Sequence, residues 1–265
     1  MSGRCARLLA VAALVCVGGC YDFSFLDNLP DDLGTDGGSE PSPSLCINSP
    51  LVGLIACTGF ESELDSFPHS STNGSTMLDK THAYRGASSM HVHVDPVGSE
   101  SSRAEAYDAS LPPLVDNSFT AYRAFVYAKD YPPGPSGARL LSVQQSDAPF
   151  LWIQIDVNSA GEILLSHKPS SSANAYVLES QQALPRNDWV CLELRVKWGG
   201  ASTGSIAVLM NDKPLTLLND MGLTLTAPPP DVAFFGVYYP DAPTASYDLW
   251  IDELMIASVP IGCDK

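Results

Sequence analysis

The sequence predicts an all-β protein, folded as an antiparallel sandwich of two sheets with few helices. From Cys46 onward, apolar and polar residues alternate in about a dozen short runs, the period of a half-buried strand. Turn-forming residues separate these runs, and no stretch keeps a 3.6-residue apolar period through two helical turns. Many short strands at close spacing are typical of a two-sheet sandwich.

Each predicted strand is an alternating run bounded by turn residues. The predicted strands are Thr58–Phe67, Ser88–Asp95, Ser102–Tyr107, Ser118–Lys129, Arg139–Gln145, Phe150–Val157, Glu162–His167, Ala175–Ser180, Trp189–Trp198, Ser205–Asn211, Leu215–Leu218, Val232–Tyr239 and Tyr247–Ala257. The clearest turns between them are Asn158–Gly161, Gly199–Gly204, Asn211–Pro214 and Pro228–Pro230.

Several segments resemble the concanavalin A-like jelly rolls. They are Gly59-Phe60-Glu61-Ser62, the run His82–Val92, Trp189–Leu194, the turn Asn211-Asp212-Lys213 and the last strand Leu249–Leu254. The resemblance covers roughly residues 57–258 and implies a jelly-roll sandwich. Lectins, laminin-G-like modules, glucanases and polysaccharide lyases share this architecture, so the resemblance implies a fold rather than one function.

The composition excludes two classes of protein. The 265 residues are 45% hydrophobic and 17% charged, which excludes a fully disordered chain. The formal net charge is −16, with 30 acidic residues against 14 basic ones. Sequence-independent nucleic-acid binding depends on lysine and arginine meeting phosphates, so no nucleic-acid partner is expected.

The first nineteen residues have the form of a secretory signal. Arg4 and Arg7 precede the apolar run Leu8–Val17, which is too short for a membrane-spanning helix of about 20 residues. The next residues, Val17-Gly18-Gly19-Cys20, resemble the lipobox of bacterial lipoproteins. The resemblance implies cleavage before Cys20, a diacylglycerol on its thiol and an acyl chain such as palmitate on its new amino group. The alternative is an ordinary cleaved signal with a chance cysteine.

A lipidated Cys20 would anchor the exported protein in the bacterial cell envelope. Tyr21, rather than an aspartate, follows the cysteine directly, so the outer membrane is the expected location. Residues 20–45 are acidic and rich in glycine, proline and serine, which predicts a flexible tether before a domain at 46–265. Removal of residues 1–19 deletes two arginines and no acid, so the mature net charge is −18.

Four cysteines remain in the exported domain: Cys46, Cys57, Cys191 and Cys263. An even number in an oxidising compartment favours two disulfides. Of the three pairings we favour Cys46–Cys57 with Cys191–Cys263, which would clip the start of the domain and tie its C-terminal tail to a central strand. A four-cysteine zinc site is the weaker alternative, because no Cys-x-x-Cys pair occurs.

The sequence carries no complete set of catalytic residues. Gly200–Gly204 fits G-x-S-x-G, but strands flank it on both sides, so it is interpreted as a hairpin loop. Alginate-lyase-like jelly rolls carry R-x-E, Q-I-H and Y-x-K-x-G-x-Y on their concave strands. The residues that match these patterns in type are Arg103, Glu105, Gln154, Gly236 and Tyr238. However, Asp156 stands in place of the histidine and Phe234 in place of the lysine, which argues against lyase activity.

Strand alternation predicts a ligand-binding face. Trp152, Gln154 and Asp156 lie on the side opposite the wholly apolar Leu151, Ile153, Ile155 and Val157, so they should point away from the core. An aromatic ring beside hydrogen-bonding groups suits a glycan, although a solvated sheet face can look the same. The aromatic residues considered for sugar stacking are Tyr122, Tyr127, Trp152, Tyr176, Trp198, Tyr238, Tyr239 and Tyr247.

Two metal sites can be considered. Glu61 and Asp252 fall where carbohydrate-binding jelly rolls often seat a structural calcium ion between their first and last strands, with the edge of the sandwich as the alternative role for Asp252 and Glu253. His91 and His93 share one strand face and would bind zinc or copper only if a third ligand came from a neighbouring strand.

These observations favour a surface-anchored, non-enzymatic module that binds carbohydrate or protein outside the cell. The expected ligand-binding residues are Arg103, Glu105, Trp152, Gln154, Asp156 and Tyr238. The alternatives are a divergent polysaccharide lyase or glycoside hydrolase of the same fold, and a structural envelope lipoprotein. No cofactor is required, and the structural ion considered is calcium at Glu61 and Asp252.

Overall fold

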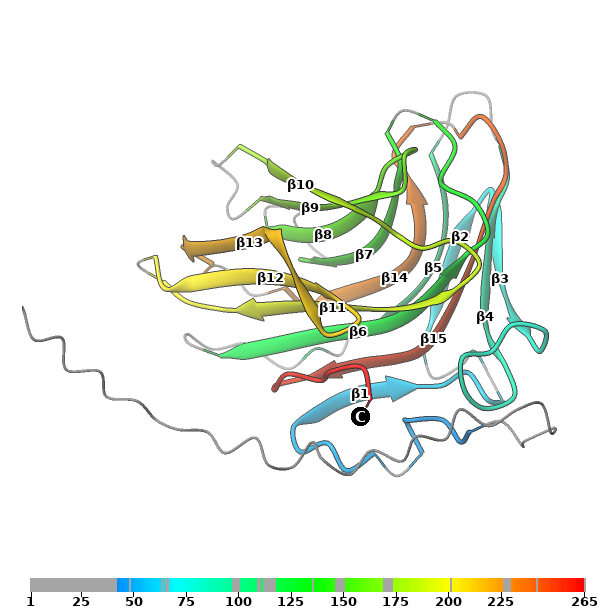
Figure 1. The fold of residues 1–265 in the computed structure, drawn as a ribbon, viewed down its shortest axis with the longest axis horizontal. Coiled ribbons are helices and arrows are strands. Elements are labelled where there is room, and N and C mark those ends of the chain that lie inside the picture. Colours follow the sequence, from blue (N-terminus) through cyan, green and yellow to red (C-terminus); the bar gives the residue numbers. More distant parts are fainter. Residues whose placement is uncertain are drawn as a thin grey trace, which may run out of the picture. The chain divides into compact units, whose positions relative to one another are not determined.

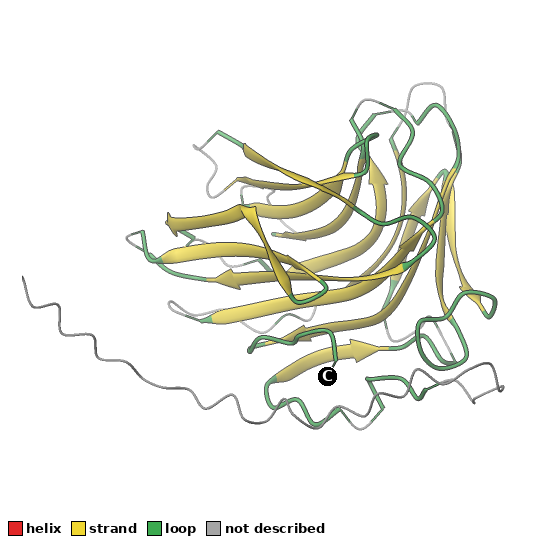
Figure 2. Cartoon of the chain, viewed as in Figure 1, coloured by secondary structure: helices red, strands yellow, loops and turns green. Residues whose placement is uncertain are grey.

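A computed structural model describes residues 42–47, 49–62, 64, 67–96, 101–108, 111, 118–134, 136–145, 151–168, 174–200, 202–225, 230–241 and 243–264. The residues up to position 41, with Cys20 and most of the expected tether, lie outside this part. The described residues form strands and loops without a helix, as Figure 2 shows. None of them forms an apolar helix of membrane-spanning length.

Fifteen strands account for the regular structure of the described residues. They are β1 (Leu54–Thr58), β2 (His69–Thr72), β3 (Gly74–Asp79), β4 (Ser89–Val94), β5 (Ser102–Asp108), β6 (Phe119–Ala128), β7 (Ala138–Gln144), β8 (Trp152–Val157), β9 (Glu162–Lys168), β10 (Tyr176–Ala183), β11 (Trp189–Lys197), β12 (Gly204–Met210), β13 (Lys213–Leu223), β14 (Val232–Tyr239) and β15 (Tyr247–Ala257).

The strands form two antiparallel sheets, which confirms the predicted jelly-roll sandwich (Figure 1). The eight-stranded sheet has the order β13-β12-β11-β6-β15-β4-β3, and β1 pairs with β15. The seven-stranded sheet has the order β10-β9-β8-β7-β14-β5-β2. Neighbours within each sheet are often distant in sequence, so residues from several parts of the chain meet on one face.

The core lies between the sheets and is built from the apolar side of each alternating run. Ile153, Ile155 and Val157 of β8 are fully buried there, in one cluster with residues such as Tyr122 and Val126 of β6. Burial of this apolar surface is the main favourable contribution to stability.

The first part of the domain differs from the prediction. A strand was expected over Thr58–Phe67, but β1 ends at Thr58 and the described residues that follow form a loop. Phe60 has a φ of 53° there, which an extended strand does not allow. Two strands follow where none was expected, because their residues are largely polar and do not alternate: β2, which pairs with β5, and β3, which pairs with β4 of the other sheet.

The ends of the domain cover the outer side of the eight-stranded sheet. Leu45, Cys46 and the start of β1 pack with Ala121 of β6 and Ile261 of the C-terminal tail. Ser44 is buried, and the Leu45 amide donates to Glu253 Oε2 at 2.8 Å. Residues of the segment 42–45, which was expected to be part of the tether, thus contact the domain.

Two disulfides, Cys46–Cys57 and Cys191–Cys263, hold these segments. Cys191 lies in β11, and the tail that ends in Cys263 is also bound by Glu193 of the same strand. Glu193 accepts hydrogen bonds from the amides of Ile261 at 2.9 Å and Gly262 at 3.1 Å. The pairing is the one favoured from the sequence.

Candidate ligand-binding face of the seven-stranded sheet

The side of the seven-stranded sheet that faces away from the core carries a set of polar and aromatic residues, called here the polar face. On β8 it consists of Trp152, Gln154 and Asp156, as alternation predicted, since their neighbours in the strand belong to the core. The other strands add Arg103, Glu105, Tyr107, Arg139, Ser142, Ser166, Lys168, Phe234 and Tyr238. Figure 1 shows that the central strands of this sheet bend along their length.

The strand register arranges these residues in rows across the sheet. One row runs from Arg103 to Tyr238, Arg139 and Asp156, each opposite the next on β5, β14, β7 and β8. Side chains directly opposite one another in an antiparallel pair lie on the same side of the sheet at contact distance. Four residues from distant parts of the chain therefore form one continuous polar row.

A second row contains Tyr107, Phe234, Ser142, Gln154 and Ser166 on the same face. The rings of Tyr107 and Phe234 lie 5.7 Å apart. Trp152 stands at the end of β8 between Gln144 of β7 and Lys168 of β9. All six ligand-binding residues expected from the sequence thus lie on one face, on β5, β8 and β14.

Arg139 occupies the middle of the first row. Its guanidinium carbon lies 4.6 Å from the centre of the Tyr238 ring, and its Nε lies 3.8 Å from Asp156 Oδ1. The other oxygen of Asp156 accepts a hydrogen bond from Ser166 Oγ at 2.7 Å. Burial raises the pKa of Asp156, whereas the bond from Ser166 and the charge of Arg139 act against that rise.

Glu105 is the most deeply placed acid of this face, with 5% of its surface exposed. Burial raises its pKa to about 7, although the charges of Arg139 and Arg103 favour its ionised form. Glu105 lies opposite Gly236, where β14 also departs from its regular register with β7. A carboxyl group that titrates near neutrality can carry or donate a proton.

Gly236 allows β5 and β14 to approach at this point. A Cβ atom on Gly236 would lie 2.3 Å from the carbonyl oxygen of Ala104 and 2.6 Å from the Cα of Glu105. The residue also has a φ of 154°, which side-chain-bearing residues rarely adopt. Beside Glu105, β14 therefore contributes no side chain to the polar face.

Sequence reasoning missed Arg139, although it correctly placed a strand there. The alternation of β7 shows that Arg139 can face outward, but its two partners lie on β8 and β14, and only the sheet order makes them neighbours. Four of the aromatic residues considered for sugar stacking are instead part of the core, where no ligand reaches them. They are Tyr122, Trp198, Tyr239 and Tyr247.

The two acids expected to hold calcium both bind the loop before β4. Asp252 Oδ2 accepts from the amides of Tyr84 at 2.9 Å and Arg85 at 3.2 Å, and Glu61 Oε2 accepts from Ala87 at 2.7 Å. Burial raises the pKa of Asp252 to about 7. Glu61 lies in a loop and not on the expected strand, and its Oε1 is buried without a hydrogen-bond partner.

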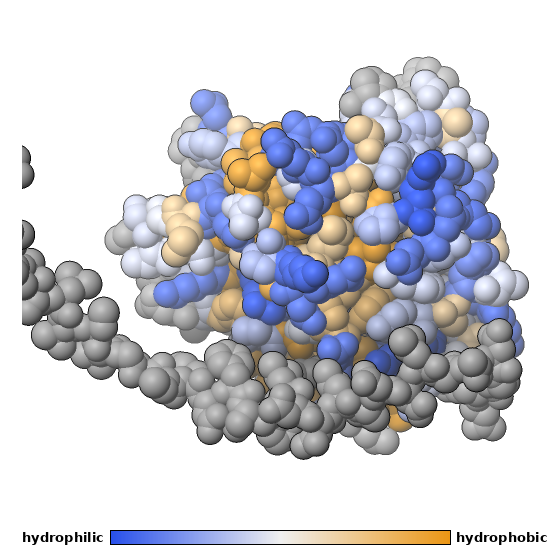
Figure 3. Space-filling model, viewed as in Figure 1, coloured by the Kyte–Doolittle hydropathy of each residue, from blue (hydrophilic) through white to orange (hydrophobic). Residues whose placement is uncertain are grey.

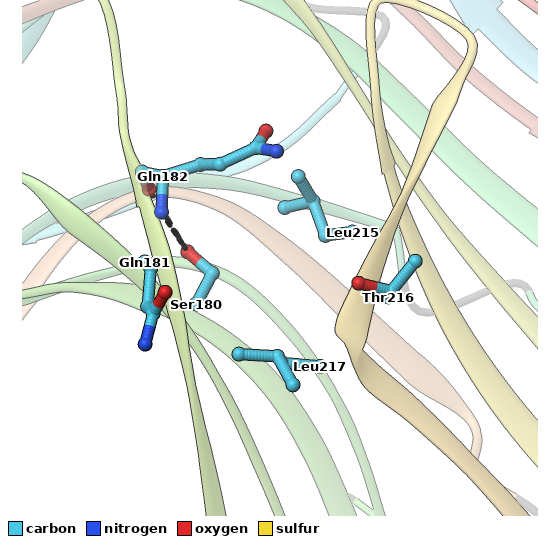
Figure 4. A pocket seen from close by; sticks show the side chains of 6 residues that line it. All are labelled: Ser180, Gln181, Gln182, Leu215, Thr216 and Leu217. Atoms are coloured by element: carbon cyan, nitrogen blue, oxygen red, sulfur yellow. Dashed lines mark hydrogen bonds between the residues drawn. The ribbon is translucent and has the colours of Figure 1, made fainter.

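A small pocket lies elsewhere, between β10 and β13. Ser180, Gln181 and Gln182 line one side, and Leu215, Thr216 and Leu217 line the other (Figure 4). Val177 of β10 and Leu217 of β13 are exposed. Figure 3 shows apolar surface between hydrophilic patches in the region where Figure 1 places β10 and β13. None of the expected site residues lines this pocket.

Comparison with known proteins supports the fold. No protein-family model and no curated protein matches the sequence. Among solved structures, an endo-β-1,4-glucuronan lyase from the fungus Trichoderma reesei superposes with a TM-score of 0.63 at 10% identity, covering 78% of this chain and 96% of that one. The cellulose-induced protein Cip1 gives 0.58 at 18% identity, covering 79% and 100%.

A third structure, the marine PL-14 alginate lyase from Aplysia kurodai, gives a TM-score of 0.52 at 10% identity, covering 69% of this chain and 87% of that one. At these identities the likeness defines the class of fold, a jelly-roll sandwich of the concanavalin A-like kind, and nothing finer.

Proposed function

We propose that the protein binds a polysaccharide chain on the polar face of the seven-stranded sheet without cleaving it. The observation that carries this proposal is the row Arg103–Tyr238–Arg139–Asp156 beside Trp152 and Gln154. Aromatic rings can stack on sugar rings, while guanidinium and amide groups hydrogen-bond to hydroxyl or carboxylate groups. Solved structures with this fold include proteins named for glucuronan, alginate and cellulose, which supports a carbohydrate as the ligand.

The contacts of Asp156 favour binding over cleavage. A lyase needs a free base near the sugar carbon that loses its proton. Asp156 stands where the resembling lyases carry histidine, and both of its oxygens are engaged, one by Arg139 and one by Ser166. Phe234, in place of their lysine, offers no proton at all.

A divergent lyase is the second candidate, and Glu105 is the observation that favours it. Its pKa of about 7 lies in the range of general acids and bases, and it belongs to the same face as Tyr238. In that case Arg103 and Arg139 would stabilise the negative charge that develops on a uronate carboxylate.

The binding test uses the purified full chain with glucuronan, alginate and cellulose oligosaccharides in isothermal titration calorimetry. Trp152→Ala and Arg139→Met are each expected to weaken binding at least tenfold, while both variants remain folded and unfold cooperatively. Arg186→Met is the matched control, since Arg186 also lies over an aromatic ring, Tyr131, and beside an acid, Asp130, but outside the polar face. Unchanged affinity in both test variants would place the ligand elsewhere.

The cleavage test follows the ultraviolet absorbance of unsaturated products from the same polysaccharides. The non-enzymatic proposal expects no increase in absorbance. An increase that Tyr238→Phe or Glu105→Gln abolishes would overturn it in favour of the lyase. Failure of every polysaccharide to bind would leave a protein ligand or a structural envelope role, the remaining interpretations of the sequence.

We also propose that the domain is exported and anchored through a lipidated Cys20 in the bacterial envelope, in the outer membrane. The motif Val17-Gly18-Gly19-Cys20 and the apolar run before it support this. Mass spectrometry of the processed N-terminus tests the anchor: a diacylglycerol and an acyl chain on Cys20 are expected, and an unmodified Cys20 would contradict it.

A structural calcium ion between Glu61 and Asp252 completes the proposal. The buried, unpartnered Oε1 of Glu61 and the buried carboxylate of Asp252 suit a hard cation, which would hold the loop Tyr84–Ala87 against β15. Added calcium should raise the melting temperature of the EDTA-treated chain, and Glu61→Gln should abolish the rise. A calcium effect of the same size in Glu61→Gln would contradict this site.

A further inference from the structure

A second cluster of ligand-type side chains lies on the eight-stranded sheet. His91 and His93 project from one side of β4, and Asp248 lies on the neighbouring β15 directly opposite His93. One donor atom from each residue can be chosen so that all three lie within 4.8 Å of one another. The neighbouring strand thus supplies the third ligand that two histidines alone lack.

The three donor atoms converge on one point. Asp248 Oδ1 lies 2.7 Å from His91 Nε2 and 2.8 Å from His93 Nδ1, so both imidazoles aim a nitrogen at the same carboxylate oxygen. In a tetrahedral zinc site with bonds of about 2.0–2.1 Å, neighbouring ligand atoms are roughly 3.3 Å apart. Each nitrogen–oxygen distance would therefore have to open by about half an ångström to admit the ion.

The side chains have room for this movement and are accessible to an ion. The exposed fractions of the His91, His93 and Asp248 side chains are 17%, 29% and 38%. These half-buried groups can shift by a fraction of an ångström without disturbing the core, because they lie on the face of the sheet opposite the buried Val92 and Val94.

Neighbouring groups hold the two imidazoles in place. His91 stacks on Trp250 with ring centres 4.5 Å apart and planes 8° from parallel. His93 directs its other nitrogen, Nε2, to Asp95 Oδ1 at 3.3 Å, the carboxylate contact that orients metal-bound histidines in many sites. The Trp250 indole in turn donates to Asp79 Oδ2 at 2.6 Å. The ligand orientations are therefore largely set before an ion arrives.

We propose that His91, His93 and Asp248 bind a divalent transition-metal ion, with zinc as the physiological ion and water in the fourth position. Two imidazole nitrogens and one carboxylate oxygen suit zinc, nickel, cobalt or copper, whereas calcium and magnesium require oxygen ligands. The ion would take the place of the two hydrogen bonds between the imidazoles and Asp248, because a histidine nitrogen that binds a metal carries no proton. The site lies on the sheet opposite the polar face and does not depend on carbohydrate binding.

The test is calorimetric titration of the EDTA-treated and dialysed full chain, free of any histidine tag, with zinc chloride. One zinc per chain with a micromolar or lower Kd is expected at the site. His91→Gln, His93→Gln and Asp248→Asn should each weaken this binding at least tenfold. His69→Gln is the matched control, since His69 lies in β2 of the other sheet and its loss should leave the affinity unchanged. Thiols before Cys46 are the same in every variant, so the difference between variants isolates this site.

Trp250 provides a second, independent measurement. Bound cobalt or copper should quench the fluorescence of the indole that stacks on His91, and Trp250→Phe should remove that quenching while zinc affinity persists. Asp248→Asn keeps the size of the side chain, so it provides a folded variant if a histidine variant does not fold. Zinc affinity that is the same in the parent, in Asp248→Asn and in the double variant His91→Gln/His93→Gln would overturn the proposal.

Discussion

The guanidinium of Arg139 lies over the ring of Tyr238, 4.6 Å from its centre, and the same side chain pairs with Asp156 on its other side. The three residues come from β7, β14 and β8, and β7 lies between the other two strands in the seven-stranded sheet. A guanidinium held from two sides keeps its orientation, and it has five N–H donors, more than these contacts use. The proposed ligand therefore meets a positive charge of fixed position rather than a mobile one.

Glu105 should make the stability of the domain depend on pH. Its pKa is raised from 4.5 to about 7 in the folded chain, so the contribution of its protonated form is complete below about pH 4.5. That contribution is lost as the pH rises through 7, up to about 3 kcal/mol in all. Asp252 acts in the same direction, so urea unfolding of the parent is compared with that of Glu105→Gln from pH 4 to pH 8. The difference in unfolding free energy between the parent and Glu105→Gln should change sharply between pH 4.5 and 7. Parallel pH profiles of the two proteins would show that the pKa of Glu105 is not raised.

Arg139→Met should raise the pKa of Glu105 further, by about one unit, because Arg139 is the larger of the two charges that favour the ionised form. The same unfolding series, run on Arg139→Met with and without Glu105→Gln, measures this as an upward shift of the pH at which the stability difference due to Glu105 stops changing. Arg186→Met serves as the control and should leave the profile in place. A downward shift in Arg139→Met would mean that Arg139 does not act on Glu105.

Gly236→Ala should destabilise the domain by about 2–4 kcal/mol, because the new methyl group meets the backbone of β5 and cannot be accommodated by a side-chain rotation. Gly134→Ala is a useful comparison. Gly134 also has a positive φ, of 100°, but its Cβ would meet nothing within 4 Å. Gly134→Ala therefore introduces backbone strain without a steric clash, and its free energy of unfolding should fall by about 1 kcal/mol. Equal losses in urea unfolding would show that the close approach of the two strands contributes nothing.

Removal of Cys191–Cys263 should cost more stability than removal of Cys46–Cys57. The first closes a separation of 72 residues and the second one of 11. The chain-entropy account then gives a difference of about 1.5 kcal/mol between the two double Cys→Ser variants. Denaturant unfolding of both variants shows which of them loses more stability. The opposite order would mean that the packing of the cysteine side chains in the folded state outweighs the entropy of the unfolded chain.

The parts of the fold that could be predicted are the strands whose own alternation of apolar and polar residues shows where they lie and which side faces the core. The alternation around Ile153 and Ile155 correctly placed β8 and directed Trp152 and Gln154 away from the core. The strands β2 and β3 were missed because each lies at the end of its own sheet, where Ser70 and Thr76 need no buried apolar partners. The strand expected after Thr58 was wrong because Phe60 adopts a left-handed conformation that its residue type does not indicate.

The candidate site was predictable only within single strands. Arg103 and Glu105, or Gln154 and Asp156, are two residues apart and share a face on any strand. Their relation to Arg139 depends on strand order and on the irregular register between β7 and β14 near Gly236, which are properties of the assembled sheet. The same holds for Asp248, whose place opposite His93 follows from the pairing of β15 with β4.

The positions of the two ends of the domain determine which side of the sandwich is open to the proposed ligand. Leu45, Cys46 and the tail around Ile261 all lie on the outer side of the eight-stranded sheet, and the Ser42 carbonyl is held there by the amide of Gly86. The first described residues of the chain and the polar face are thus on opposite sides of the sandwich. A polysaccharide that lies across Trp152, Tyr238 and Arg139, as we propose, therefore does not meet residues 42–46.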